Sequence, residues 1–463
     1  MEGKKIKRFF LNTYDLNKIN INTDLQKIYQ QIEITEKNSD KNYPPNMDKK
    51  INSLGKKRYE TSFYTGTGGN IYIYWKQYLF HDKKKEYLDK FYQSLITNLS
   101  ISEKEKDMTN SFFMGKSGIY MFFCIYSIEV KNKETFEKFF KKLIELKSFS
   151  ESKEAEVELL YGTTGYLYTL LFLKKYIDSF KHNSDINNII STDMNNLLIE
   201  TILKIFDILL NSGIDYMIKY KWNKSLLYPF PVNEDEPEFY LGAAHGLIGA
   251  IYMLLSTLKF FPQSLNYEKS INLTKIKISE LLLKNIKYIQ SLQITSTGNF
   301  PSDLEGTDSG DLVHFCHGCI GAIHLFLLAE EIFPNNNFKE TAFLSNKCLW
   351  ERGLLCKGNG VCHGMSGVVY ALIKLYKATK NELYLKEAIG ICEGTFDPNI
   401  QKQVKEFKDP QRLCRGVPDT PYSLMEGEGG CLVMYYDLVK VILNNDKDSQ
   451  NSFWGMFPGY EIF

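Results

Sequence analysis

Long apolar stretches alternate with polar stretches along this chain, and most of the apolar ones begin at a pair of glycines separated by two residues. After one such pair, apolar residues recur at i, i+3, i+4 and i+7, the spacing of one helix face: Val369, Leu372, Ile373 and Tyr376. The stretch that follows Gly246 and Gly249 keeps a similar spacing: Leu247, Ile251, Leu254 and Leu258. The pattern therefore predicts that each glycine pair opens a helix.

The glycine pair recurs seven times: Gly66/Gly69, Gly115/Gly118, Gly162/Gly165, Gly246/Gly249, Gly318/Gly321, Gly364/Gly367 and Gly427/Gly430. Successive pairs start 46 to 84 residues apart. The shortest spacing fits two helices per unit, and the longer ones indicate insertions. The chain therefore reads as a series of seven related units.

The segments ahead of the glycine pairs are helical in period but richer in charge, as in Ile271 to Leu292, and we expect them to form an outer layer. No comparable series of alternating strands is present. We predict an all-α fold, a closed α/α toroid of seven helical hairpins. We expect one domain over residues 1–463, with an N-terminal arm at about 1–60, the repeats at about 61–445 and a short C-terminal tail.

Three polar stretches interrupt the pattern and are expected to be surface loops. Two are rich in Asn, Asp, Ser or Lys, Glu33 to Arg58 and Asp178 to Asn196. The third, Trp222 to Glu238, carries three prolines and leads into the fourth glycine pair, where it could cover a central site.

Charge and composition exclude several classes of protein. The 56 basic and 55 acidic residues give a net charge of +1, which does not favour nucleic acid as a partner. No apolar run reaches the roughly 18 residues of a membrane span, and the first residues lack a signal-peptide core, so we expect a cytoplasmic protein. A small basic patch, Lys4 to Arg8, would support at most marginal peripheral binding at the plasma membrane.

Two Cys-His dipeptides, Cys316-His317 and Cys362-His363, stand at the same place in their repeats, directly before a glycine pair. Soft thiolate and imidazole ligands in this arrangement indicate one zinc centre. From spacing alone, a closed site with two cysteines and two histidines and an open site with three protein ligands both remain possible. Cys319 adds a further candidate, because Cys316-x-x-Cys319 also has ligand spacing.

Several phrases of the sequence resemble the eukaryotic LanC-like proteins, relatives of the bacterial lanthionine cyclases. They are Ala244-His245-Gly246-Leu247-Ile248-Gly249, Phe315-Cys316-His317-Gly318, Lys357-Gly358-Asn359-Gly360-Val361-Cys362-His363-Gly364 and Pro418-Asp419-Thr420-Pro421-Tyr422-Ser423-Leu424-Met425-Glu426-Gly427. The resemblance covers nearly the whole chain. It implies a seven-hairpin toroid with one central Zn²⁺ bound by Cys316, Cys362 and His363, and with His317 lining the site without binding the metal.

The resemblance also implies an activity, the zinc-dependent addition of glutathione to dehydroalanine or dehydrobutyrine in proteins or peptides, formed when phosphate is eliminated from phosphoserine or phosphothreonine. His245 stands at the family's position for the acid that protonates the resulting enolate. Glu158 stands where the bacterial enzymes have an aspartate, and is a further acid-base or orienting candidate. Kinases are candidate partners.

Glutathione carries two carboxylates, so its pocket should offer fixed cations. By motif position these are Lys357, Arg415 and Arg8, although the loop before Pro418 is one residue longer than the family pattern. Thr163 and Lys116 replace residues that are often basic and acidic, respectively, in the family, which would alter the charge of the cavity.

Two other functions compete with this one. A zinc- and glutathione-binding adaptor in redox or signalling complexes would need the same ligands without turnover. A glycan-processing enzyme is suggested only by the α/α toroid, and such enzymes generally need paired carboxylates in the cavity. The cysteines and histidines at the glycine pairs favour thiol chemistry over this last alternative.

Overall fold

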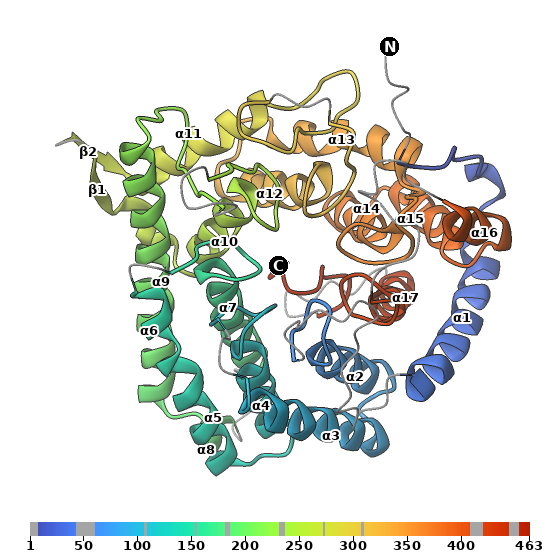
Figure 1. The fold of residues 1–463 in the computed structure, drawn as a ribbon, viewed down its shortest axis with the longest axis horizontal. Coiled ribbons are helices and arrows are strands. Elements are labelled where there is room, and N and C mark those ends of the chain that lie inside the picture. Colours follow the sequence, from blue (N-terminus) through green and yellow to red (C-terminus); the bar gives the residue numbers. More distant parts are fainter. Residues whose placement is uncertain are drawn as a thin grey trace.

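The computed structural model describes residues 8–42, 61–105, 109–152, 155–180, 186–230, 237–271, 274–306, 310–407, 420–443 and 453–463. Within these residues the chain is mostly helical, and helices form two concentric layers (Figure 1). The seven inner helices all follow glycine pairs: α2 (Gly68–Phe80), α4 (Ser117–Glu129), α7 (Thr163–Asp178), α10 (Leu247–Phe260), α12 (Cys319–Ile332), α14 (Met365–Thr379) and α17 (Glu428–Leu443). The prediction that each glycine pair opens a helix is confirmed.

Seven longer or more polar helices form the outer layer: α1 (Ile21–Asn42), α3 (Lys85–Ser102), α5 (Lys133–Glu145), α9 (Thr192–Lys219), α11 (Ile278–Ser291), α13 (Phe338–Arg352) and α15 (Glu382–Gly394). The remaining described elements are short: α6 (Lys147–Ser150), α8 (Ile186–Ile189), α16 (Pro398–Glu406), the 3-10 turns η1 (Leu16–Lys18) and η2 (Pro262–Asn266), and the strands β1 (Glu268–Ile271) and β2 (Thr274–Lys277).

The two layers differ in how far their helices are buried. In α10 every residue from Leu247 to Leu258 is buried, as expected of a helix that is apolar all round. In α5 the buried residues form a single stripe at helical spacing: Phe136, Phe139, Phe140, Leu143 and Ile144. The inner helices thus pack on all sides, whereas the outer helices cover them with one face.

The inner helices form a closed ring, in which each contacts the next in chain order and α17 contacts α2. Each of α2, α4, α7, α10, α12 and α14 is covered by the outer helix that follows it in the chain, but α17 is covered by α1 from the N-terminal part of the chain (Figure 1). The ring is therefore closed by elements from both ends of the chain.

Three of the expected loops or boundaries differ from the structure. The polar stretch after Glu33 continues α1 as far as Asn42, because Leu25, Ile28 and Ile32 give this helix a buried stripe. Residues 43–60, the rest of that stretch, lie outside the described residues. The polar stretch after Asp178 contains α8 and the start of α9, where Ser191 caps the helix by accepting a hydrogen bond from the Met194 amide.

The third difference concerns the expected helix from Ile271. The chain there forms a two-stranded antiparallel hairpin, in which Glu268 pairs with Lys277. In its second strand the β-branched residues Thr274 and Ile276 alternate with lysines, a pattern that favours strand over helix. The helix α11 begins only at Ile278.

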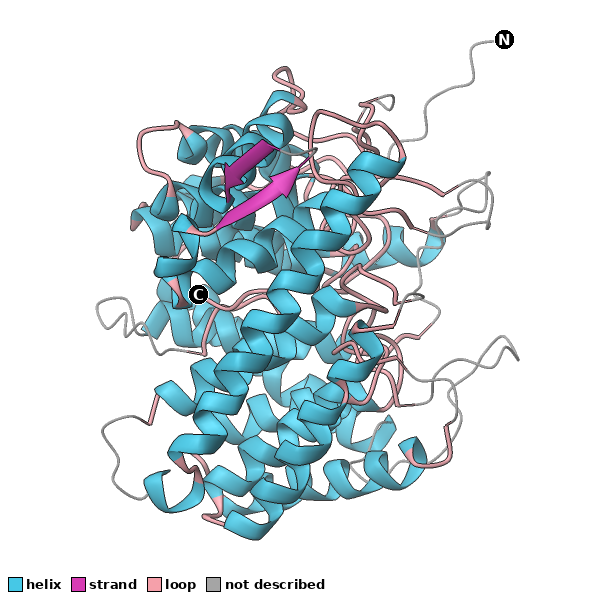
Figure 2. Ribbon diagram, turned by 90° about the vertical axis from the view of Figure 1, so that its left-hand side faces the viewer, coloured by secondary structure: helices cyan, strands magenta, loops and turns pink. Residues whose placement is uncertain are grey.

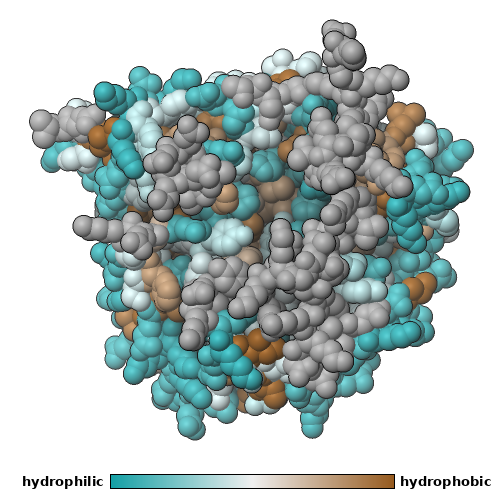
Figure 3. All heavy atoms as spheres, viewed as in Figure 1, coloured by the Kyte–Doolittle hydropathy of each residue, from teal (hydrophilic) through white to brown (hydrophobic). Residues whose placement is uncertain are grey.

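The glycine-pair loops gather on one face of the ring, the right-hand side of Figure 2, which is also the face seen in Figures 1 and 3. Figure 3 shows this face hollowed near its centre, with hydrophobic residues deep in the hollow and hydrophilic residues around it. Residues 453–463 run inside the ring, where Phe457, Tyr460 and Ile462 are fully buried. Among the described residues, no helix combines the length and apolar character needed to cross a membrane.

Candidate metal centre

The loops that precede the inner helices are tied to one another by backbone hydrogen bonds. The Phe315 amide donates to the Cys362 carbonyl at 2.8 Å, the Cys362 amide donates to the Met425 carbonyl at 2.9 Å, and the Met425 amide donates to the Tyr64 carbonyl at 3.1 Å. The tips of the fifth, sixth, seventh and first motifs are thereby held side by side. The residues one and two places ahead of these four glycine pairs therefore lie in adjacent loops.

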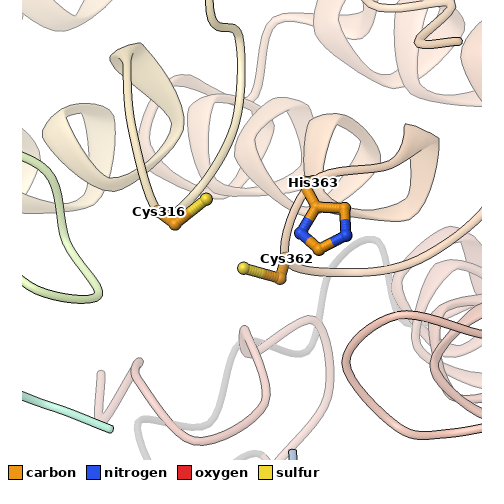
Figure 4. A group of neighbouring side chains, drawn as sticks. All are labelled: Cys316, Cys362 and His363. Carbon is orange, nitrogen blue, oxygen red and sulfur yellow. The ribbon is translucent and has the colours of Figure 1, made fainter. Parts of the chain in front are cut away.

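Cys316, Cys362 and His363 form the group that the motifs predicted. Their donor atoms all lie within 4.8 Å of one another (Figure 4). Cys316 comes from the loop before α12, and Cys362 and His363 come from the loop before α14. A regular tetrahedral zinc site separates its ligand atoms by about 3.5 to 3.8 Å, so a shift of about 1 Å would bring these atoms to binding distance.

The chemistry of the donor set also fits Zn²⁺, which prefers thiolate and imidazole ligands. The two thiols are hydrogen-bonded to each other, and this contact lowers the pKa of Cys316. The same contact, together with burial, raises the pKa of Cys362. The pair therefore shares protons that a bound dication would displace.

Neither of the other two candidate ligands belongs to this group. Cys319 is fully buried at the start of α12, where its thiol hydrogen-bonds Cys348 of α13 and its amide donates to Asn299 Oδ1 at 2.9 Å. The ring of His317 packs edge-on against Tyr240 at a centroid distance of 5.2 Å. The geometry favours the open arrangement with three protein donors.

His245 and Glu158 form a hydrogen-bonded pair, with 2.9 Å between His245 Nδ1 and Glu158 Oε2. The Glu158 carboxylate is buried and also accepts hydrogen bonds from the amides of Leu160, at 2.9 Å, and Tyr161. Burial lowers the pKa of His245, but the hydrogen bond and charge of Glu158, with a contribution from Cys362, raise it above its usual value overall. The pair thus favours the protonated form of His245 relative to a buried histidine without such a partner.

Aromatic rings surround His245. Phe230 lies at a centroid distance of 4.6 Å, Tyr240 at 6.2 Å and Tyr161 at 6.5 Å. Phe230 belongs to the irregular stretch after Trp222 that we expected near the central site, and residues 231–236 of that stretch lie outside the described residues. The contact with Phe230 places the described part of this stretch beside His245.

Two of the three expected cations are near the metal group. The Cys356 amide donates to the Arg8 carbonyl at 3.1 Å, so the N-terminal chain runs along the loop that carries Lys357. The charges of Lys357 and Arg8 both act on the buried His314, whose pKa is lowered first by burial and then by His363 and these cations. Neither Lys357 nor Arg8 forms an ion pair within the part of the chain that is described. Arg415 lies outside the described residues.

The sequence model of the lanthionine synthetase C-like protein family matches residues 57–453. The chain belongs to this family. The match spans all seven glycine pairs and both Cys-His dipeptides.

Two curated relatives of this lanthionine synthetase C-like protein are similar over part of their length. A glutathione S-transferase LANCL1 from Danio rerio is 29% identical over 285 residues, which cover 61% of this chain and 59% of the relative. LanC-like protein GCL1 from Arabidopsis thaliana is 27% identical over 311 residues, covering 66% and 58%, respectively. The matched part thus spans about three fifths of each relative.

Among solved structures, nisin cyclase has the same fold. It superposes with a TM-score of 0.53 and 16% sequence identity, covering 92% of this chain and 98% of the cyclase. The likeness supports the two-layered ring of helices.

Thr163 and Lys116, at the starts of two inner helices of this LanC-like protein, both form hydrogen bonds with neighbouring segments. The Thr163 hydroxyl is buried and lies 3.1 Å from Ser150 Oγ and 3.2 Å from the Glu156 carbonyl oxygen. Lys116 Nζ donates to the Glu105 carbonyl at 3.4 Å. Thr163, at the start of α7, and Lys116, just before α4, thus form hydrogen bonds with segments that come after outer-layer helices in the chain.

Tyr64 and Glu426 also lie near the metal group, although we did not expect a role for either residue from the sequence. The pKa of Tyr64 is raised first by burial and then by Cys362, Glu426 and Cys316, so its hydroxyl lies close to all three. Tyr64 occupies the position of Cys316 and Cys362 in its own motif, and Glu426 occupies that of His363. Aligning the seven motifs by their glycines would have found both residues.

Proposed function

We propose that this protein adds the thiol of glutathione to dehydroalanine or dehydrobutyrine residues in proteins or peptides, using a zinc ion bound by Cys316, Cys362 and His363. The observation that carries the proposal is the convergence of these three donors, from two separate motifs, within 4.8 Å of one another. The name of the Danio rerio relative, a glutathione S-transferase, supports glutathione as the thiol.

Cys316, Cys362 and His363 would hold the zinc ion with three protein ligands, and the substrate sulfur would be a further ligand. When bound, zinc would stabilise that sulfur as a thiolate near neutral pH. The residues of the chain supply the rest of the reaction. The thiolate forms a C–S bond to the β-carbon of the alkene, and the displaced π electrons generate an enolate at the α-carbon.

His245 is the proposed acid for this enolate. Its Nδ1 is held by Glu158, so the proton on Nε2 is available for transfer to the α-carbon. The thiol proton, lost when the thiolate forms, restores the protonated imidazole through solvent, and the reaction is balanced. Glu158 acts as a positioning residue that keeps His245 charged.

Lys357, Arg8 and Arg415 are the proposed binding residues for the two carboxylates of glutathione. Lys357 and Arg8 have no carboxylate partner within the described chain. A bound carboxylate could therefore form ion pairs with them without displacing a protein group. Loss of one such contact is expected mainly to raise the KM for glutathione.

The test is to measure zinc content of the purified protein and to follow, by mass spectrometry, a dehydroalanine peptide incubated with protein and glutathione. We expect one equivalent of zinc and a peptide adduct with the mass of glutathione. Cys362→Ala should lose both zinc and adduct formation, because it removes a ligand and leaves two donors. Cys124→Ala is a matched control, since Cys124 is buried in α4 away from the metal group.

Each other outcome has a defined meaning. Adduct formation that is unchanged in Cys362→Ala would reject the proposal. Zinc and glutathione binding without any adduct would support the adaptor function instead. An adduct that forms equally well in His245→Ala would remove His245 from the role of acid.

A further inference from the structure

The seven motifs share a register that extends the site beyond the metal donors. The residues two places before the first glycine include Cys316 and Cys362, and in the first motif this residue is Tyr64. The residues one place before it include His245 and His363, and in the seventh motif this residue is Glu426. Tyr64 and Glu426 thus stand where other motifs carry the reactive groups.

The first and seventh motifs lie directly beside the loop that carries the metal donors. The Met425 carbonyl accepts from the Cys362 amide at 2.9 Å, and the Met425 amide donates to the Tyr64 carbonyl at 3.1 Å. The backbone of Glu426 packs against Gly360, where an added Cβ would lie only 2.5 Å from the Glu426 carbonyl oxygen. The loop of Lys357 and Cys362 is therefore in close contact with Glu426.

The carboxylate of Glu426 is oriented but not neutralised. Its Oε2 accepts a hydrogen bond from the buried Thr420 hydroxyl at 3.0 Å, and its amide donates to Ser423 Oγ at 3.2 Å. Within the described parts of the chain, no lysine or arginine forms an ion pair with it. A half-buried, fixed and unpaired negative charge is costly unless a cation binds there in function.

The Tyr64 hydroxyl links this carboxylate to the metal group. It lies close enough to Cys362 and Glu426 for both groups to raise its pKa, after the larger effect of burial. A phenol can donate one hydrogen bond and accept others. It can therefore donate to Cys362 and still accept a hydrogen bond from a ligand.

We propose that Glu426 and the Tyr64 hydroxyl form a subsite for the α-ammonium group of the thiol substrate. This inference rests on the proposed function and deepens it, because it specifies a zwitterionic thiol. Glutathione carries one ammonium and two carboxylates. Three charged groups near the metal group have no ion-pair partner within the described residues, and their signs match this pattern: Glu426 for the ammonium, and Lys357 and Arg8 for the carboxylates.

The test compares glutathione with N-acetylglutathione, in which the ammonium is replaced by a neutral amide. Rates of adduct formation on a dehydroalanine peptide are measured for the wild type and for Glu426→Gln. In the wild type, acetylation should lower kcat/KM by roughly 10- to 100-fold, mostly through KM, as expected for the loss of a charge-assisted hydrogen bond. In Glu426→Gln, kcat/KM for glutathione itself should already be lowered by a similar factor. Acetylation of the thiol should then lower kcat/KM little further.

Two further variants separate a local effect from a general one. Glu428→Gln makes the same chemical change two residues away, on an exposed side chain, and should keep the wild-type sensitivity to acetylation. Tyr64→Phe keeps the ring and removes the hydroxyl, and should lose part of that sensitivity. Zinc content should be unchanged in Glu426→Gln, because Glu426 is not a ligand.

The inference is overturned if acetylation lowers kcat/KM by the same factor in Glu426→Gln and in the wild type. If no protein forms an adduct, the proposed function fails, and the subsite is tested by calorimetric titration of the zinc-loaded proteins with the same two thiols. The subsite then predicts that acetylation weakens binding to the wild type but not to Glu426→Gln. The subsite is rejected if acetylation weakens binding equally in the wild type and in Glu426→Gln, or if glutathione does not bind to either protein.

Discussion

At the scale of single residues, the charge state of His245 is set by one partner. Burial lowers the pKa of the imidazole, and the Glu158 carboxylate more than offsets this effect across a 2.9 Å hydrogen bond. Glu158 is itself held by the amides of Leu160 and Tyr161, so it cannot turn away when His245 gives up its proton.

Glu158→Gln should shift the pH dependence of the proposed reaction. If His245 must be protonated to act as the acid, activity falls as pH rises through its pKa. Glu158 raises this pKa, so the fall in activity occurs at higher pH. Without the carboxylate, burial lowers the pKa of His245, so the alkaline limb of kcat/KM should move to lower pH. A pH profile of adduct formation measures this shift, and zinc content serves as the control. An alkaline limb that stays in place would show that His245 is not the titrating acid.

At the scale of elements, the loop between Asn299 and α12 depends on one glycine. Gly318 has φ of +113°, and an added Cβ would lie 2.2 Å from the Leu312 carbonyl oxygen and 3.0 Å from Asn299 Oδ1. The side chain of Asn299 also binds the carbonyls of Gly310 and Leu312, at 2.6 and 2.9 Å. The loop that carries Cys316 is therefore shaped around the absence of a side chain at Gly318.

Gly318→Ala should displace this loop and weaken metal binding. The conformation costs about 1 to 3 kcal/mol for a residue with a side chain, and the clash adds to this cost. Gly306→Ala is the matched control, because Gly306 also has a positive φ of +72° but the nearest atom to an added Cβ is 3.6 Å away. We expect zinc content to fall in Gly318→Ala alone, while denaturant unfolding shows a smaller loss of stability in the control. Full zinc content in Gly318→Ala would contradict this account of the loop.

The seven inner helices could be predicted from sequence because their apolar stretches follow a repeated glycine signal. The covering of α17 by α1 could not be predicted, because α1 is rich in Lys, Asn and Glu. Its apolar stripe finds a partner only when the two ends of the chain meet in the closed ring. The same holds at the site. Cys316 and Cys362 stand out by residue type, whereas Glu426 and Tyr64 gain a role only because the first and seventh motifs meet beside them.

At the scale of the whole molecule, residues 453–463 join the inner helices from inside the ring. Lys76 of α2 donates to the Phe453 carbonyl, Lys175 of α7 to the Ile462 carbonyl and Lys374 of α14 to the Glu461 carboxylate, at 2.6 Å in each case. Phe457 stacks on Phe315, the residue before Cys316, at a centroid distance of 4.2 Å. This segment thus links the packing of the ring to the loop of the metal group.

Among these contacts, the buried ion pair of Lys374 and Glu461 should contribute most to the stability of the fold. Burial alone would raise the pKa of Glu461, but Lys374, with His324 and Lys377, lowers it to about 2. A carboxylate with a lowered pKa stabilises the fold above its unfolded-state pKa, so the contribution should be complete above about pH 5 and lost as pH falls toward 2. Glu461→Gln leaves Lys374 buried without its partner charge and should cost about 3 to 5 kcal/mol of unfolding free energy.

Denaturant unfolding of Glu461→Gln, Lys374→Met and the double variant tests this pair. Each single change leaves one buried charge, whereas the double change leaves none, so the double variant should be destabilised by less than the sum of the two single changes. Lys142→Met, at a half-exposed ion pair with Glu103 of 3.8 Å, is the control and should change stability by at most about 1 kcal/mol. Because Phe457 carries the tail's contact to Phe315, zinc should also dissociate faster from the single variants than from the control. Strictly additive effects would show that Lys374 and Glu461 act independently, and that the tail is held in the ring by its aromatic contacts instead.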